Sequence, residues 1–435
     1  MTRLITLFNK KDFCKTHFYI GIAFLICFLF ICLIKIVSYF LMMPVYTLFD
    51  VSDWLINYEG GFVRRGLVGE LLYFLYSWTS CPIKRAILWI NSISFLACFL
   101  LIIKSCRVVK YSTIPFLVIY CGVISQLGFY RRDFLVLIIV YGIISSFFCY
   151  LREKKRSAFL ITQILTVSVI LIHEATFFFI VPIMFFINWF ASDKRWISRE
   201  KAISAIKCFT LPVIAMAMVS VYKGNWNVAT SIWQSWMPMF LEYPDSTTPL
   251  MGLGVEWLYS RSVIEASKFH LDWNFMTHQG TLVDVIRCML TLCLTFACTY
   301  FVVLRSHFFN FRKKCLENHH HGITVGNILL LQFVFMIPMF TILSTDYGRT
   351  ILYCVVSSIF IAAQLRLKGI ALHIPLLNIS ERIDRFVSHN KILSSYWTFY
   401  LVIMLFPIRT WHYITLPNDM FLYKYITLAV KIVLA

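Results

Sequence analysis

Five arginines stand in three short polar segments of a chain that is otherwise strongly apolar: Arg64, Arg65, Arg131, Arg132 and Arg349. Arginine is always charged and presents a planar fork of donors, and its strong partners are phosphate and carboxylate groups. Glycines at positions 60, 61 and 66 surround the first pair, and glycine lets the backbone approach a bulky group closely. These residue types and spacings predict a binding site for a large anion.

Acidic residues and a histidine accompany the arginines, and such groups could orient or deprotonate a hydroxyl. The candidates are Asp53, Glu59, His173, Glu174 and Asp346. Each also has a structural explanation, since Asp53 could cap a helix and Asp346 could pair with Arg349 three residues later. His173 and Glu174 could form a satisfied buried pair. A purely structural role for the whole set would require every one of these explanations to be correct at once. We therefore expect a functional site.

Composition sets the class of protein. The chain has 435 residues, of which 60% are hydrophobic and 14% charged, whereas about a quarter of the residues in a soluble domain are charged. Its continuous apolar runs of about twenty residues each predict an all-α polytopic integral membrane protein and not a β-barrel. A net charge of +19 would suggest nucleic acid in a soluble protein. In a membrane protein, Lys and Arg collect in cytoplasmic loops, so we expect no nucleic-acid partner.

Apolar runs mark the expected transmembrane helices in a single domain, residues 1–435. About 11–12 spans are predicted from runs of this length. Residues 66–79 are ambiguous, because this segment is short for a span and contains Glu70, and residues 420–435 form a weaker run. The other runs lie at about 17–41, 86–103, 113–129, 134–151, 158–174, 176–191, 206–222, 281–304, 323–344, 350–366 and 394–408.

Charge orients these spans. Basic residues before the first run place the N-terminus in the cytoplasm, and every strongly basic loop falls on the same side if residues 66–79 do not cross. We therefore expect residues 66–79 to form an interfacial or re-entrant helix within an outer loop, 42–85. A second, large outer (periplasmic) loop spans 223–280 and is rich in Trp and Tyr, which predicts helices on the membrane surface.

This topology places all of the candidate residues at the outer face, although outer loops are normally poor in arginine. Ionisable residues at membrane depth are costly and tend to be functional. ATP and nucleotide sugars fit poorly, because they are cytoplasmic and the sequence has no P-loop pattern. An anionic, lipid-linked substrate fits the outer position, the arginines and the acid–base groups together.

The order of these features resembles that of bacterial O-antigen and capsule polysaccharide polymerases. The features are a basic first helix, an outer loop rich in acidic and aromatic residues, an arginine pair before a span, an outer His-Glu pair about forty residues later, a large outer loop and the turn DYGR. The chain is also similar to the wider GT-C glycosyltransferases, whose first outer loop carries interfacial helices and a catalytic acidic residue.

The resemblance implies polymerisation of oligosaccharide repeat units carried on undecaprenyl diphosphate, at the periplasmic face of the bacterial inner membrane. It implies that Arg64, Arg65, Arg131, Arg132 and Arg349 bind the diphosphate or sugar. His173, Glu174 or Asp346 would orient or deprotonate the acceptor, and Asp53 and Glu59 would match the acidic position of the GT-C loop. No metal or other cofactor is expected, and a chain-length regulator and a flippase are the candidate protein partners.

Three other interpretations of the function remain open. A transporter or flippase for lipid-linked sugars would carry charges near the middle of its spans and repeated halves. A GT-C enzyme that adds a single sugar would share the outer arginine site. A membrane acyltransferase would need a His with access from the cytoplasm, whereas His173 is expected on the outer side.

Overall fold

The computed structural model describes residues 53–109, 131–191, 197–222, 224–240, 262–275, 325–343, 347–370 and 378–393, together with single residues elsewhere. This described part is helical and contains no strand, as the sequence predicts. Its elements are η2 (Asp53–Leu55), α4 (Gly66–Thr79), α5 (Ile83–Val109), α7 (Asp133–Glu153), α8 (Arg156–Ile172), α9 (Thr176–Phe190), α10 (Arg199–Val221), α11 (Trp226–Phe240), α13 (Val263–Phe275), α15 (Val325–Phe335), η6 (Met339–Leu343), α16 (Tyr347–Lys368) and α17 (Asn378–His389).

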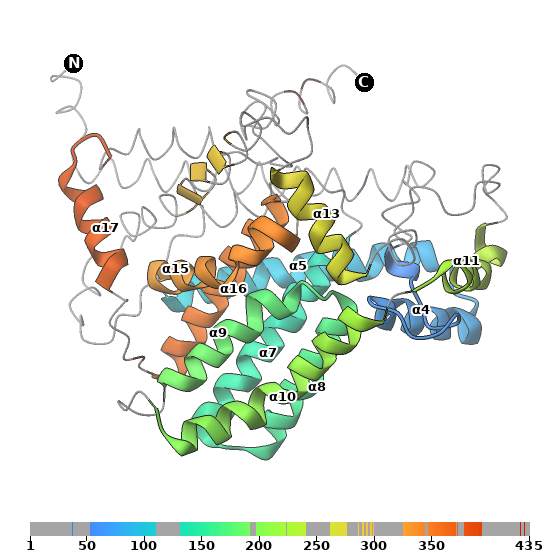
Figure 1. Ribbon diagram of the computed structural model, residues 1–435, viewed down its shortest axis with the longest axis horizontal. Coiled ribbons are helices and arrows are strands. Elements are labelled where there is room, and N and C mark those ends of the chain that lie inside the picture. The colour runs from blue at the N-terminus through green and yellow to red at the C-terminus, as the bar shows by residue number, and fades with distance from the viewer. Residues whose placement is uncertain are drawn as a thin grey trace.

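The central bundle consists of α5, α7, α8, α9, α10, α15 and α16, each of which contacts at least two of the others (Figure 1). Helices α4 and α11 lie together at one edge of the view, and α17 lies at the opposite edge. The most enclosed helix is α16, which contacts α5, α7, α9 and α15. Its central position explains why nearly all of its side chains are buried.

Four described helices are long and apolar enough to cross a membrane: Arg85–Val109, Asp133–Glu153, Arg199–Val221 and Gly348–Lys368. They coincide with four of the predicted runs. The runs 158–174, 176–191 and 323–344 form shorter apolar helices, the last of them interrupted near Pro338 before the π-helical turn η6. The runs 17–41, 113–129, 394–408 and 420–435, and most of 281–304, lie outside the described residues. The total of about 11–12 spans therefore stays a prediction.

A short charged turn joins α7 to α8 and makes them antiparallel neighbours. Helix α7 ends where Lys154 adopts a left-handed conformation, φ 54°, and its N–H donates to the carbonyl of Tyr150 at 2.9 Å. Lys155 is extended and starts α8. Because α7 begins at Asp133 and α8 ends at Ile172, this hairpin brings their other two ends together at the opposite end of the bundle.

Two glutamines donate hydrogen bonds to backbone carbonyls of neighbouring helices and so support the bundle. Pro212 lies inside α10 and has no N–H, so the carbonyl of Cys208 four residues earlier loses its helical partner. Gln163 of α8 donates to that carbonyl at 2.9 Å. Gln332 of α15 likewise donates to a carbonyl of α9 and to Ser357 of α16, at 2.8 Å for the hydroxyl. These bonds fix the rotation of α8 and α15 against their neighbours.

The two predicted outer loops contain helices, as expected. Residues 66–79 form α4, with Leu71, Phe74 and Trp78 exposed along one face. Residues 223–280 contain α11 and α13, where Trp236 of α11 is buried and donates to the carbonyl of Leu55 at 2.7 Å. This Trp is thus a packing residue that joins the second loop to the first. The placement of α4, α11 and α13 at a membrane surface remains a prediction.

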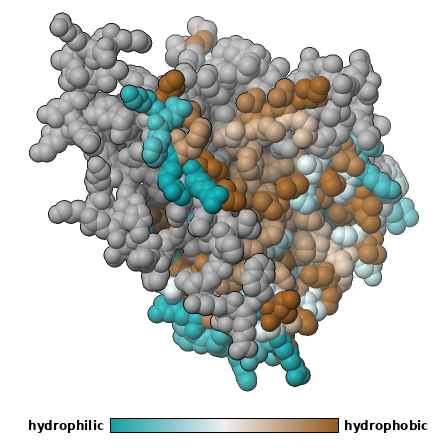
Figure 2. Space-filling view, turned by 60° about the vertical axis from the view of Figure 1, so that its left-hand side comes forward, coloured by the Kyte–Doolittle hydropathy of each residue, from teal (hydrophilic) through white to brown (hydrophobic). Residues whose placement is uncertain are grey.

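Figure 2, which brings the α17 side forward, shows an elongated hydrophilic strip in front of a largely hydrophobic surface and further hydrophilic residues at the lower end. Helix α17 is amphipathic. Ile379, Ile383 and Phe386 recur at spacings of four and three residues, and Arg382 and Arg385 lie between them in the sequence.

Candidate functional site

A tight packing arrangement positions Arg64 and Arg65 at the start of α4. Arg65 is the N-cap residue and adopts a left-handed conformation, φ 65°, which is unfavourable for a residue other than glycine. A Cβ atom on Gly66 would lie 2.2 Å from the ring of Tyr58, and one on Gly69 would lie 1.9 Å from the carbonyl oxygen of Ile56. The two glycines therefore let α4 lie directly on the preceding segment, and the chain must turn sharply at Arg65.

The turn between α8 and α9 supplies Glu174. His173 ends α8 in an extended conformation, and its carbonyl accepts hydrogen bonds from the N–H and hydroxyl of Thr176 at 3.0 and 2.7 Å. The Glu174 carboxylate accepts from Nε of Arg65 at 2.9 and 3.1 Å and from Nη2 at 2.6 Å. Arg64 lies 3.6 Å from the same carboxylate. Glu174 thus holds both arginines of the first pair.

Asp53 links the first loop to the start of α7. Its carboxylate lies 2.8 Å from Nη2 of Arg132 and accepts from Nε of the same residue at 3.2 Å. Arg65 lies 3.6 Å away on the other side. Arg132 also donates to the backbone carbonyl of Arg65 at 3.0 Å, so it stabilises the strained turn directly.

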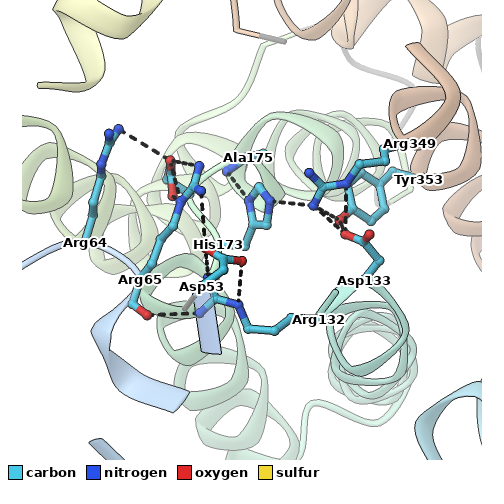
Figure 3. A network of polar contacts seen from close by, with 10 residues as sticks. Asp53, Arg64, Arg65, Arg132, Asp133, His173, Ala175, Arg349 and Tyr353 are labelled. Carbon is cyan, nitrogen blue, oxygen red and sulfur yellow. Dashed lines mark hydrogen bonds and ion pairs between the residues drawn. The ribbon is translucent and has the colours of Figure 1, made fainter. Parts of the chain in front are cut away.

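A second cluster joins α7 to α16 through Asp133. Its Oδ1 accepts from Nη2 and Nε of Arg349 at 2.6 and 3.2 Å and from the hydroxyl of Tyr353. The ring of Tyr353 stacks on Phe179 of α9, with centroids 4.7 Å apart. Nη2 of Arg349 lies 3.2 Å from Nε2 of His173, which connects the two clusters. In Figure 3, His173 lies between Arg65 on one side and Arg349 on the other.

The structure therefore brings together most of the residues singled out in the sequence, although they come from four separate segments. The gathered residues are Asp53, Arg64, Arg65, Arg132, His173, Glu174 and Arg349. Arg131 is half-buried and lies two residues before Asp133 in the sequence. Glu59 is exposed and its carboxylate is not part of this network among the described residues. Asp346 lies outside the described residues.

Two residues of the network were not predicted as site residues. Asp133 directly follows the arginine pair 131–132, so its position in that segment was a usable signal. Tyr353 lies four residues after Arg349 and therefore shares its face of α16. Nothing in a single apolar helix distinguishes such a tyrosine from a core residue, because its partner lies on another helix.

Burial and charge act against each other on the acidic groups outside the spans. Burial favours the neutral form of Asp53, but Arg132, Arg65 and His173 outweigh it and hold the pKa of Asp53 well below its ordinary value. Burial likewise opposes ionisation of Glu174, and Arg65 and Arg64 hold its pKa well below the usual range. Both carboxylates are consequently ionised and are weak bases at neutral pH.

His173 has the opposite environment. Burial, together with the charges of Arg65 and Arg349, lowers the pKa of His173 to about 3, against the opposing effect of Glu174. The imidazole is therefore neutral at neutral pH. Burial lowers the pKa of Arg65, but Glu174 and Asp53 together raise it by a larger amount. The net shift of the pKa is therefore upward, and this guanidinium stays charged.

The four arginines differ in access to the surroundings. The side chain of Arg132 is 1% exposed and that of Arg64 is 8% exposed, whereas Arg65 is 29% and Arg349 16% exposed. Arg132 is thus fixed inside the protein. Arg65 and Arg349 flank His173 and are open enough to meet an anion that arrives from outside, which is the chemistry that this arrangement supports best.

Among the described residues, no group of three or more His, Cys, Asp or Glu side chains is arranged to hold a metal ion. The chain was also compared with known proteins, and no family model, no curated protein and no solved structure matches it.

Proposed function

We propose that this chain is a membrane glycosyltransferase that polymerises oligosaccharide repeat units carried on a lipid diphosphate. The observation that carries the proposal is the meeting of Arg65, Arg349 and neutral His173 at one end of an apolar helical bundle. A lipid diphosphate has a strongly anionic group next to a membrane-embedded tail. Partly exposed arginines at one end of an apolar helical bundle are suited to both parts.

The proposed reaction moves a sugar chain from one lipid diphosphate to the hydroxyl of an acceptor sugar. The acceptor oxygen forms a bond to the anomeric carbon of the donor, and the bond between that carbon and the phosphate oxygen breaks. The electron pair of the broken bond leaves with the diphosphate, and the acceptor hydroxyl loses its proton to a base or to water. Charge grows on the leaving diphosphate, so preorganised guanidinium groups favour the transition state.

The network suggests a division of roles for this reaction. Asp53 and Glu174 each bind two arginines and have lowered pKa values, so we assign them the role of positioning the guanidinium groups. Arg132 is buried and supports the turn at Arg65. Arg65 and Arg349 are then the residues that contact the diphosphate. Asp346 stays a candidate for the proton acceptor by its place beside Arg349 in the sequence.

The proposal is tested by deleting the gene and examining the chain length of the surface glycan on gels. A ladder that collapses to one repeat unit supports a polymerase. Loss of one sugar without loss of the ladder would indicate a single-addition transferase, and accumulation of lipid-linked units with no surface glycan would indicate a transporter.

Complementation with variants connects the result to the site. We expect Arg65→Ala and Arg349→Ala to fail to restore the ladder when expression is adjusted so that each variant reaches the wild-type amount in the membrane. The matched control is Lys368→Ala, which removes the cation of the ion pair at the other end of α16. A full ladder with both arginine variants would refute the proposed site, and a ladder unchanged by gene deletion would refute the proposed function.

A further inference from the structure

The two ring nitrogens of His173 have conflicting hydrogen-bond partners. The residue is 7% exposed and sits in the turn that joins α8 to α9. Its two ring nitrogens face two different donors. Nδ1 lies 3.3 Å from the backbone nitrogen of Ala175, and Nε2 lies 3.2 Å from Nη2 of Arg349.

The contact with Ala175 determines the tautomer. A backbone N–H cannot rotate away, and the one of Ala175 points at Nδ1, so Nδ1 is the acceptor. A neutral imidazole carries one hydrogen, which must then be on Nε2. The turn is held in this geometry by the two hydrogen bonds from Thr176 to the carbonyl of His173. The backbone of the turn therefore fixes Nε2–H as a donor.

Nε2–H points at a group that cannot accept it. A guanidinium has only donors, so the contact between Nε2 of His173 and Nη2 of Arg349 brings two N–H groups together. No other described residue accepts a hydrogen bond from Nε2. A buried donor without an acceptor is costly, and such cases in native proteins call for an explanation.

An oxyanion would satisfy both groups at once. One oxygen placed between His173 and Arg349 can accept from Nε2–H and from Nη2–H, which removes the conflict between the two donors. Arg65 lies on the other side of the imidazole and offers a second guanidinium (Figure 3). An anion with several oxygens on adjacent phosphorus atoms could reach both arginines and the imidazole, whereas a carboxylate has only two oxygens.

We propose that a phosphate-type oxyanion binds between Arg65 and Arg349 and accepts a hydrogen bond from Nε2–H of neutral His173. This inference rests on the proposed function, because it makes the diphosphate of the lipid-linked donor the natural occupant, and free pyrophosphate shares the same chemistry. It assigns His173 the role of a neutral hydrogen-bond donor to the leaving diphosphate. The base for the acceptor hydroxyl must then be another group.

Two substitutions separate a donor from a base. His173→Phe keeps a flat ring of similar size beside Tyr353, whose centroid is 6.2 Å away, but has no N–H. His173→Gln keeps an N–H donor but cannot act as a base. The exposed His389 in α17 provides the control His389→Phe. The full chain is reconstituted in nanodiscs, and binding of radiolabelled pyrophosphate and of farnesyl diphosphate is measured for each variant.

We expect His173→Phe to weaken binding about tenfold, the loss typical of one hydrogen bond to a charged partner. His173→Gln should bind within about twofold of the wild type if only the donor matters. Binding of both probes would identify the diphosphate group alone as the ligand, and binding of farnesyl diphosphate only would identify the lipid form. Binding of neither probe by the wild type would overturn the inference, as would equal binding by the wild type and His173→Phe.

A spectroscopic measurement on the wild type makes the test independent of folding in the variants. With 15N-labelled histidine, the His173 signal, identified by its absence in His173→Gln, should show Nε2 protonated and Nδ1 bare at pH 7. Pyrophosphate should shift Nε2 more than Nδ1. A protonated Nδ1 would contradict the inference. If pyrophosphate binds as expected and gene deletion leaves the glycan ladder intact, the anion site stands and the proposed polymerase function fails.

Discussion

Helices α7 and α16 run side by side and are joined by an ion pair at each end, but the two pairs have different surroundings. At the first turns, Arg349 lies 2.6 Å from Asp133, and the aspartate side chain is only 3% exposed. At the last turns, Lys368 lies 3.3 Å from Glu153, whose side chain is 32% exposed. Lys155 shares that glutamate at 2.6 Å and is itself mostly exposed.

The difference shows which charges the fold depends on. The exposed cluster is surrounded by solvent or headgroups, which compete with each ion pair, so its loss changes little. In the buried cluster, each charge has been removed from water, and only its partners offset that cost. Deleting one partner there leaves an uncompensated charge inside the protein. A buried network of this kind holds its side chains in one geometry, which suits the precise placement of arginines around a substrate.

Arg132→Ala is expected to give the largest effect on stability. It removes the partner of Asp53 and the donor to the Arg65 carbonyl, and breaking a buried pair typically costs about 3–5 kcal/mol. The unfolding temperature in detergent should fall strongly, whereas Lys368→Ala should leave it nearly unchanged. Equal unfolding temperatures for the two variants would show that burial does not distinguish the two ends.

Gly69→Ala is expected to have the next largest effect, because it disturbs the segment that carries Arg65. The new Cβ would lie 1.9 Å from the Ile56 carbonyl oxygen, and the backbone on both sides would have to move, at a cost of about 3 kcal/mol. Gly142→Ala in α7 is the control, since its Cβ would meet only the end of the Leu165 side chain at 3.2 Å. Thermal unfolding should separate the two, and a stable Gly69→Ala variant would contradict the close packing of α4.

Acidification is expected to give the smallest effect on stability, and it acts through buried His173. Unfolded His173 binds a proton below its ordinary pKa of 6.5, whereas the folded residue stays neutral down to a pKa of about 3. The unfolded state therefore binds more protons in this window, so stability falls as the pH falls. Between pH 7.5 and 5 the loss should be about 1–2 kcal/mol.

The control for the pH experiment is His173→Gln, which cannot titrate and should show a flatter dependence of unfolding temperature on pH over the same range. The lowered pKa values of Asp53 and Glu174 add a further loss only at more acidic pH, because unfolded carboxyl groups are protonated below about 4. A wild-type unfolding temperature that rises between pH 7.5 and 5 would contradict the neutral, buried state of His173.

Much of the described fold follows from local sequence. The apolar runs 86–103, 134–151, 206–222 and 350–366 are each long enough to cross a membrane, and each forms a long helix. Hydropathy could not show that α16 is enclosed on nearly all sides, since a helix that faces lipid and one that faces protein are equally apolar. That position depends on which helices surround it.

The sequence by itself determined which charged segments meet. Charge placement and alternating spans bring the ends of α4, α7, α8 and α16 to one end of the bundle, and the structure gathers Arg65, Arg132, Glu174 and Arg349 there. Only the tertiary structure decided how they pair. In the structure, Asp53 pairs with Arg132, Glu174 with Arg65 and Asp133 with Arg349, and Glu59 is exposed. The physical reason is that topology fixes the height of a residue along the bundle, whereas pairing depends on helix rotation and side-chain reach, which close packing with neighbouring helices sets.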